Sequence, residues 1–183
     1  MGATTFEDFR DVLNTAAGNA CRCSRSALAD TIARLAPGAA LWGSPELEAN
    51  WAGLTSELAA LGITVRVDSS PTTTRDQPWG ITTARAAISE SGSVILKENR
   101  LNERSVSLMT ERLIVLCASS NLHPSLDDAA RILREIAAEG SSYATLVSGP
   151  SRTADIERQL TIGVQGPGEL HVIVVDDEYI ESA

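Results

Sequence analysis

The chain has 183 residues, of which 43% are hydrophobic and 21% are charged, a size and composition typical of one globular domain. Its formal net charge of −9 makes nucleic acids and anionic membranes poor partners, because binding to either needs a basic surface. No apolar run approaches the roughly 18–20 residues that a membrane span requires, and three cysteines are too few for a disulfide framework, so we expect a cytoplasmic protein without a membrane span.

Residues 1–36 are expected to form an N-terminal helical segment that packs on the same domain as the rest of the chain. Apolar residues recur at helical spacing on both sides of residues 18–23, which are interpreted as a break between two helices. Residues 37–183 are expected to form an α/β domain.

A strand–helix–strand unit opens this domain. Residues 39–42 are a short apolar strand, and Ser44 and Pro45 suit the N-cap and first turn of a helix that ends at Gly62. Residues 63–67 follow as a strand. Short connections in this order predict two parallel strands joined by a right-handed crossover.

The pattern changes in the middle of the chain. A polar loop at residues 68–78 leads into three short strands, which we expect to form a β-rich insert with an antiparallel turn, over 79–83, 86–89 and 94–97. Residues 113–118 are an uninterrupted apolar run, which is typical of a central strand buried on both faces.

The last third of the chain alternates helices and strands, predicted over 125–140 (helix), 143–148 (strand), 153–160 (helix) and 170–175 (strand). The whole pattern predicts an α/β fold, in which a mainly parallel central sheet has helices on both faces. We expect this sheet to contain residues 39–42, 63–67, 113–118, 143–148 and 170–175.

The first candidate site is the turn that follows the strand at residues 143–148. It offers glycine for close backbone approach, hydroxyls that can cap a helix, and an arginine that can bind an anion through two donors. Its expected ligand-binding residues are Ser148, Gly149, Pro150, Ser151, Arg152, Thr153, Asp155 and Glu157. The alternative is an ordinary turn with a capped helix.

A second glycine-rich turn, at residues 163–168, enters the last strand and adds Gly163 and Gly166 to the expected ligand-binding residues. The order of its glycines matches a dinucleotide-binding motif only loosely. The alternative is a loop that packs against the first turn.

The third candidate cluster spans residues 80–93. Here Glu90 is the candidate catalytic nucleophile, and the expected ligand-binding residues are Gly80, Thr82, Ser91 and Gly92. The alternative for Glu90 is a solvated acid in a hairpin turn. We expect all three clusters to converge in one pocket at the carboxyl edge of the sheet, where open α/β sheets bind ligands.

Metal and cluster ligands are scarce. Cys21 and Cys23 have CxC spacing without a partner pair, and His171 lies within an apolar strand. We therefore expect no metal site and no iron–sulfur cluster in this chain.

Two segments carry a resemblance to a known family. Residues 148–177 (SGPSRTADIERQLTIGVQGPGELHVIVVDD), together with residues 80–93, Arg104 and Ser107, are similar to the LUD domain family. The resemblance covers roughly residues 40–177. One departure is Gln165, which stands where the family commonly has histidine.

The resemblance implies a fold like that of the sugar-phosphate isomerases and CoA-transferases, a three-layer α/β/α sandwich. It also implies a role in L-lactate utilization, as one of three proteins that together oxidise lactate to pyruvate. The iron–sulfur clusters of that system are expected in partner proteins. In the related CoA-transferases a glutamate near a glycine-containing turn is the nucleophile, and Glu90 is the position that compares with it.

Two functional hypotheses remain open from the sequence. The chain is either a subunit or accessory of a lactate-oxidising complex that binds a small anionic ligand, or a free-standing enzyme. The enzyme would act on a small phosphorylated or CoA-linked substrate, with Glu90 as nucleophile or base.

Overall fold

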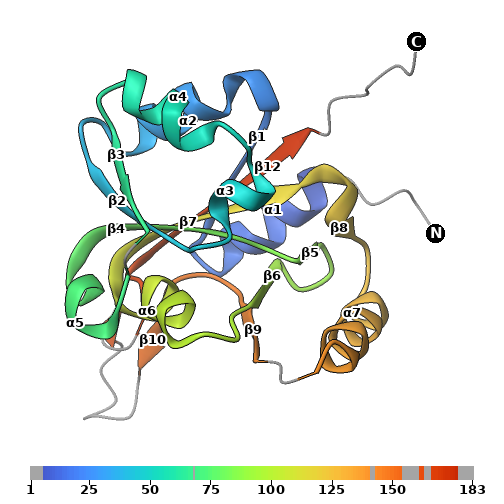
Figure 1. The fold of residues 1–183 in the computed structure, drawn as a ribbon. Coiled ribbons are helices and arrows are strands. Elements are labelled where there is room, and N and C mark those ends of the chain that lie inside the picture. Colours follow the sequence, from blue (N-terminus) through green and yellow to red (C-terminus); the bar gives the residue numbers. More distant parts are fainter. Residues whose placement is uncertain (1–5, 68, 141–142, 154–160, 163–165, 177–183) are drawn as a thin grey trace.

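A six-stranded, wholly parallel sheet forms the centre of the computed structural model, which describes residues 6–67, 69–140, 143–153, 161–162 and 166–176 (Figure 1). In spatial order its strands are β1 (Asn19–Ser24), β12 (Glu169–Asp176), β7 (Thr110–Ala118), β4 (Gln77–Thr83), β2 (Ala40–Gly43) and β3 (Thr64–Arg66).

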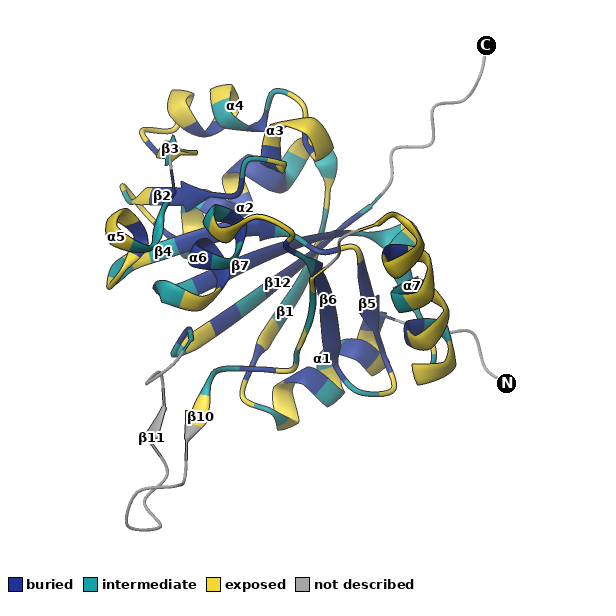
Figure 2. Ribbon diagram, turned by 60° about the horizontal axis from the view of Figure 1, so that its bottom comes forward, coloured by how far each residue is buried: buried dark blue, intermediate teal, exposed yellow. Residues whose placement is uncertain are grey.

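The longest strands are apolar because both of their faces are covered. Along β7, Leu113 and Val115 join the core on one face, whereas Ile114 and Leu116 join the core on the other. The first core packs against α1 (Phe6–Thr15), and the second against α2 (Leu28–Leu35), α3 (Leu47–Asn50) and α4 (Leu54–Ala60). Figure 2 shows the central strands buried and the outer surfaces of the helices exposed.

A second, smaller sheet lies beside the first, in the order β8 (Leu122–His123), β5 (Ala86–Ile88), β6 (Ser93–Lys97) and β9 (Ala144–Val147). Strands β5 and β9 both pair antiparallel with β6. Helix α7 (Leu126–Ala138) covers its outer face with Ala129, Ile132 and Ile136.

The connections contain short elements: the 3₁₀ turns η1 (Arg25–Ala27) and η2 (Ser119–Asn121), and the helices α5 (Pro71–Thr74) and α6 (Leu101–Met109). A two-stranded ribbon joins β10 (Arg152–Thr153) to β11 (Thr161–Ile162). Helix α5 lies where a polar loop was expected, and Ser70 begins it with a capping box.

The α/β/α architecture with a mainly parallel sheet is confirmed, but three strand assignments were wrong. Residues 18–23, expected as a break within a helical segment, largely form β1 at the edge of the central sheet. Residues 79–83, expected in the insert, lie in β4 of that sheet. Residues 143–148, expected in the central sheet, instead supply β9 to the second sheet.

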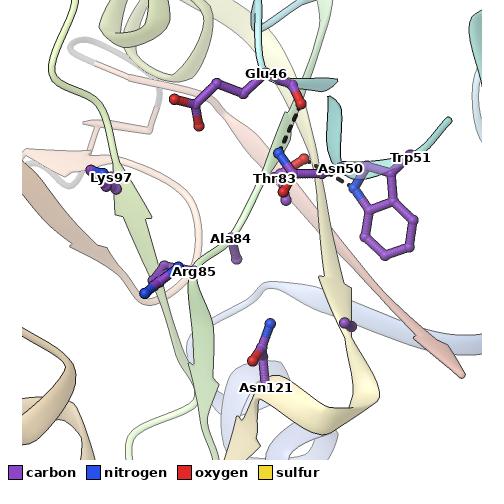
Figure 3. Close-up of a pocket in the computed structure, with 9 residues that line it drawn as sticks. Glu46, Asn50, Trp51, Thr83, Ala84, Arg85, Lys97 and Asn121 are labelled. Atoms are coloured by element: carbon purple, nitrogen blue, oxygen red, sulfur yellow. Dashed lines mark hydrogen bonds between the residues drawn. The ribbon is translucent and has the colours of Figure 1, made fainter. Parts of the chain in front are cut away.

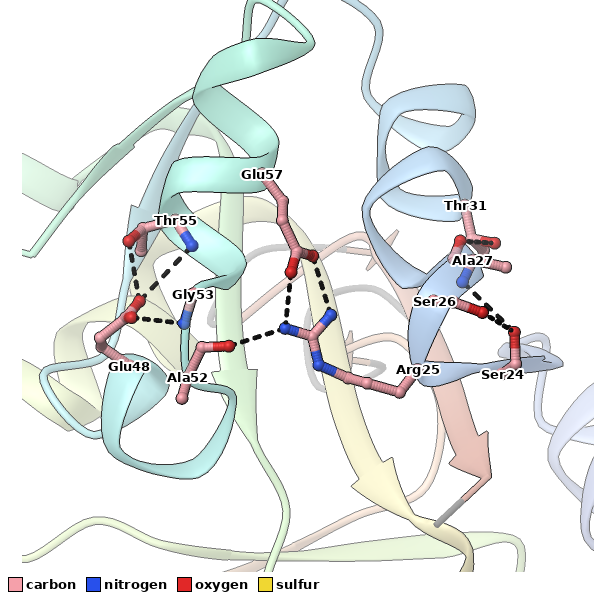
Figure 4. A network of polar contacts seen from close by, with 10 residues as sticks. All are labelled: Ser24, Arg25, Ser26, Ala27, Thr31, Glu48, Ala52, Gly53, Thr55 and Glu57. Atoms are coloured by element: carbon pink, nitrogen blue, oxygen red, sulfur yellow. Dashed lines mark hydrogen bonds and ion pairs between the residues drawn. The ribbon is translucent and has the colours of Figure 1, made fainter. Parts of the chain in front are cut away.

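The single helix expected from Ser44 to Gly62 is two helices, α3 and α4, separated at Gly53, whose φ is +79°. The Glu48 carboxylate accepts hydrogen bonds from Gly53 N and Thr55 Oγ1, each at 2.7 Å, and so caps the start of α4. These hydrogen bonds lower the pKa of the Glu48 carboxyl from its ordinary value, and the bond from Thr55 has the largest effect. Arg25, just before α2, joins that neighbouring helix to α4 by donating to both oxygens of Glu57 (Figure 4).

Candidate functional site: a cleft at the carboxyl edge of the sheet

The carboxyl edge of the central sheet contains a point where the strand order reverses. The chain leaves β2 toward β3 on one side, and it leaves β4 toward β7 on the other. In open parallel sheets, such a reversal leaves a crevice between two adjacent strand ends, because the connections diverge there. The ends of β2 and β4 are therefore the place where this topology favours a ligand site.

A cleft of about 260 Å³ lies at this reversal. Four strand ends contribute to its lining (Figure 3). The lining residues are Glu46, Asn50 and Trp51 after β2, Thr83 at the end of β4 with Ala84 and Arg85 after it, Ala118 at the end of β7 with Asn121 after it, and Lys97 at the end of β6. Its size suits a small metabolite better than a nucleotide or a CoA ester.

Hydrogen bonds fix one wall of the cleft. The indole Nε1 of Trp51 donates to Thr83 Oγ1 at 3.0 Å, which joins the segment after β2 to the end of β4. Asn50 Nδ2 donates to the backbone oxygen of Glu46 at 2.8 Å (Figure 3). Since Trp51 is also buried in the core under α4, this wall is anchored to the fold.

Two cations, Arg85 and Lys97, line the cleft. Both pair with the carboxylate of Glu139, which follows α7: Arg85 Nη2 lies 3.4 Å from Oε1, and Lys97 Nζ donates to Oε2. The pKa of Glu139 is lowered from its ordinary value, and the hydrogen bond from Lys97 is the largest cause. A guanidinium and an ammonium side by side can bind a carboxylate or another small anion.

The turn at residues 148–153 lies at the opposite, amino edge of the sheet, so its expected placement was wrong. Gly149 has φ +92°, and a Cβ there would lie 2.3 Å from the backbone oxygen of Ala16, just before β1. Arg152 Nη2 donates to that same oxygen at 2.6 Å. Gly149 and Arg152 therefore hold the turn against the end of α1.

The two glycine-rich turns pack against each other, as the alternative interpretation of the second turn proposed. Ser151 N donates to Pro167 O at 2.8 Å, and a Cβ on Gly166 would lie 3.2 Å from Ser151 Cβ. Pro150 is half-buried in the same turn. Thr153 pairs with Thr161 in the ribbon instead of beginning a helix. Asp155, Glu157, Gly163 and the expected helix from residue 154 onward lie outside the described residues.

Part of the third cluster does approach the first. Ser93 Oγ lies 2.8 Å from Ser91 Oγ and 2.5 Å from the hydroxyl of the exposed Ser148. A Cβ on Gly92 would lie 2.6 Å from Leu13 N. These turns thus meet around the end of α1, away from the carboxyl edge.

The remaining predicted residues have places in the fold. Glu90 is exposed, and its Oε2 accepts a hydrogen bond from Leu126 N at 2.7 Å, at the start of α7. Gly80 lets α6 approach β4, because a Cβ there would lie 3.0 Å from Val106 O of that helix and 2.5 Å from Thr110 Oγ1 just after it. Thr82 is buried within β4. The expected convergence of all three clusters at the carboxyl edge is therefore wrong.

The cleft residues had only weak signals in the sequence. Lys97 is the sole lysine and Arg85 is one of fourteen arginines, and neither lies in a glycine-rich motif. The only useful indication was their position in the sequence. The helix start expected at Ser44 comes directly after one predicted strand, and Arg85 comes directly after another. Linking the two requires knowing that β2 and β4 are neighbours.

Metal ligands do not cluster in the described part of the chain, where no group of three or more His, Cys, Asp or Glu side chains could hold an ion. Cys21 and Cys23 are half-buried on β1, where burial raises the pKa of both thiols, and Cys117 is buried in β7. None of the described helices has the length and apolar character needed to cross a bilayer.

A structural relative shares the whole architecture. A crystal structure of a DUF162 family protein from Deinococcus radiodurans aligns with a TM-score of 0.67 at 21% identity, covering 92% of this chain and 94% of that one. At this identity the likeness concerns the fold alone.

Curated sequences give a more specific likeness. Lactate utilization protein C of Shouchella clausii is 41% identical over 101 residues, and that of Bacillus subtilis is 37% identical over 101 residues. Each match covers 54% of this chain, but only 44% and 42% of the respective relative, so less than half of each relative is matched. The model of the LUD domain matches residues 74–175, which is more than half of the chain. The chain therefore belongs to the LUD domain family.

Proposed function

We propose that this chain acts in L-lactate utilization and binds a small carboxylate in the cleft at the carboxyl edge of the central sheet. In this proposal it is a subunit or accessory of a lactate-oxidising complex, and the iron–sulfur clusters belong to partner proteins. The observation that carries the binding proposal is the pair of cations, Arg85 and Lys97, at the strand-order reversal.

Three features support a carboxylate as the ligand. The family and the names of its curated relatives point to lactate metabolism, whose substrate and product are both small carboxylates. The two cations are the groups that bind such an anion, and each charge-assisted hydrogen bond contributes about 1.5–3 kcal/mol. The amides of Asn50 and Asn121 supply polar groups of the kind that bind a hydroxyl or keto oxygen.

The enzyme hypothesis with Glu90 receives less support. The Glu90 carboxylate already accepts the Leu126 N–H, and Glu90 is not among the residues that line the cleft. A cleft of about 260 Å³ is also small for a CoA ester.

Isothermal titration calorimetry with L-lactate and with pyruvate tests the binding proposal. We expect the wild-type chain to bind at least one of them, and Arg85→Ala to weaken that binding about tenfold or more, which is about 1.4 kcal/mol. Arg134→Ala, which removes the same charge from the exposed side of α7, is the control and should leave the affinity unchanged. Absence of binding, or equal binding by Arg85→Ala, would contradict the proposal.

The partner proposal has a separate test. A tagged chain, purified from its own host after growth on L-lactate, should co-elute with an iron–sulfur protein, measured by mass spectrometry and iron analysis. Elution of the chain alone at native concentrations would argue against a complex.

A further inference from the structure

The carboxylate of Glu139 divides its two oxygens between the two cations of the cleft. Oε1 faces Arg85 and Oε2 accepts from Lys97, so one carboxylate bridges the guanidinium and the ammonium. The three charged groups come from three elements, because Arg85 follows β4, Lys97 ends β6 and Glu139 follows α7. Arg85 and Lys97 flank one β-hairpin, whereas Glu139 lies 42 residues after Lys97 in the sequence, so the fold brings the carboxylate to the two cations.

The two cations have a ligand site on one side and an internal carboxylate on the other. Arg85 and Lys97 line the cleft, whereas Glu139 is not among its lining residues. Helix α7, which Glu139 terminates, packs on the outer face of the second sheet. A carboxylate that entered the cleft would therefore compete with Glu139 for the same N–H donors.

The existing bridge is weak enough to be exchanged. The side chains of Arg85 and Glu139 are 49% and 38% exposed, and ion pairs this accessible contribute little, because water solvates both partners. Lys97 is more protected, at 25% exposed. Glu139 thus holds the cations in place without saturating them.

We propose that Glu139 is an internal competitor that sets the affinity and the ligand class of the cleft, an inference that rests on the proposed function of the cleft. Glu139 occupies the cations as a carboxylate does, with one oxygen on each, so the matching ligand is a small carboxylate that bridges them in the same way. A bound ligand displaces Glu139 from the two cations. The affinity of the cleft for its ligand is therefore lower than it would be without Glu139, by the free energy that this displacement costs.

Pyruvate titrated into Glu139→Gln tests this inference. We expect pyruvate to bind this variant about fivefold more tightly than wild type, a gain of about 1 kcal/mol and the size expected for losing exposed ion pairs. The matched control is Glu135→Gln, which removes the same charge from α7, the helix that Glu139 follows; there Glu135 pairs with Arg131. The control should bind pyruvate as wild type does.

A third comparison isolates the competition itself. In a Lys97→Met background, Glu139→Gln should raise pyruvate affinity by less, because one of the two shared donors is gone. Melting temperatures of all variants show whether each remains folded under the conditions of the titration.

The outcomes separate this inference from the function on which it rests. If wild type binds pyruvate and Glu139→Gln binds no more tightly, the competition is refuted while the carboxylate site stands. If Glu135→Gln tightens binding equally, the effect is one of overall charge, and the inference is again refuted. If neither wild type nor Glu139→Gln binds pyruvate or L-lactate, both proposals fail.

Discussion

Glu98 is a buried carboxyl that should make the stability of the fold depend on pH. It follows β6, the residue is 1% exposed, and neither carboxyl oxygen has a hydrogen-bond partner of good geometry among the described residues. Burial, as the first cause, raises its pKa from 4.5 to about 7, and the nearby charge of Glu103 adds to the effect. The Ser107 and Thr145 hydroxyls and Arg104 act in the opposite direction but are weaker.

The sign of the effect follows from the two states. Below pH 4.5 the carboxyl is protonated in both the folded and the unfolded chain, so no free energy is lost to burying a charge at Glu98. Between pH 4.5 and about 7 the unfolded chain loses this proton first, and the folded state becomes progressively less stable. A rise of the pKa from 4.5 to about 7 corresponds to about 3 kcal/mol, reached above pH 7.

We therefore expect Glu98→Gln to gain stability relative to wild type as the pH rises. The difference in free energy of unfolding between the variant and wild type should be about 3 kcal/mol larger at pH 8 than at pH 4.5. Urea unfolding of both proteins between pH 4.5 and 8 measures this. The comparison across pH removes any constant cost of the buried amide. The control is Glu111→Gln, an exposed glutamate with the same change in charge, which should show no such trend. A difference between Glu98→Gln and wild type that is constant with pH would refute the argument.

Two further predictions concern the turn at the amino edge of the sheet. Gly149→Ala should destabilise the fold by more than about 3 kcal/mol in urea unfolding, because it adds a clash with Ala16 O to a strained φ. Gly38→Ala, with φ +65° and no atom within 4 Å of the new Cβ, should cost only about 1 kcal/mol, and equal losses would contradict the clash. Arg152→Ala removes the hydrogen bond to Ala16 O, so it should lower the free energy of unfolding by about 1 kcal/mol and with it the melting temperature. It should leave the affinity of the cleft for pyruvate unchanged. Weaker pyruvate binding by Arg152→Ala would return the ligand site to this turn.

The central strands were predictable because burial on both faces leaves a mark in the sequence. Residues 113–118 and 170–175 are continuous apolar runs, and both form the middle of the parallel sheet. Strand β1 has no such mark, since NACRCS is polar and half-exposed at the edge of the sheet. Its strand conformation comes from pairing with β12, a contact between residues about 150 positions apart.

The glycine clusters were expected at the wrong edge of the sheet for a physical reason. Glycine allows a backbone to approach a ligand, but it equally allows one backbone to approach another. The neighbouring backbone belongs to Ala16 at Gly149, to Leu13 at Gly92 and to Val106 at Gly80. Glycines in a single sequence indicate that some group comes close to the backbone, but they do not show which group it is. Turns that bind a ligand and turns that pack against another segment therefore have similar sequences.

The cleft is a property of strand order more than of any motif. Its lining comes from the segments after β2, β4 and β7 and from the end of β6, and these meet only because β2 lies between β3 and β4. Its cations, Arg85 and Lys97, lie within the residues that match the LUD domain, whereas the wall made by Trp51 lies before them. We therefore expect the requirement for an anion to depend on the matched domain, and the shape of the ligand to depend on the segment after β2. Exchanging Trp51 should alter which carboxylate binds, while exchanging Arg85 should weaken the binding of all of them.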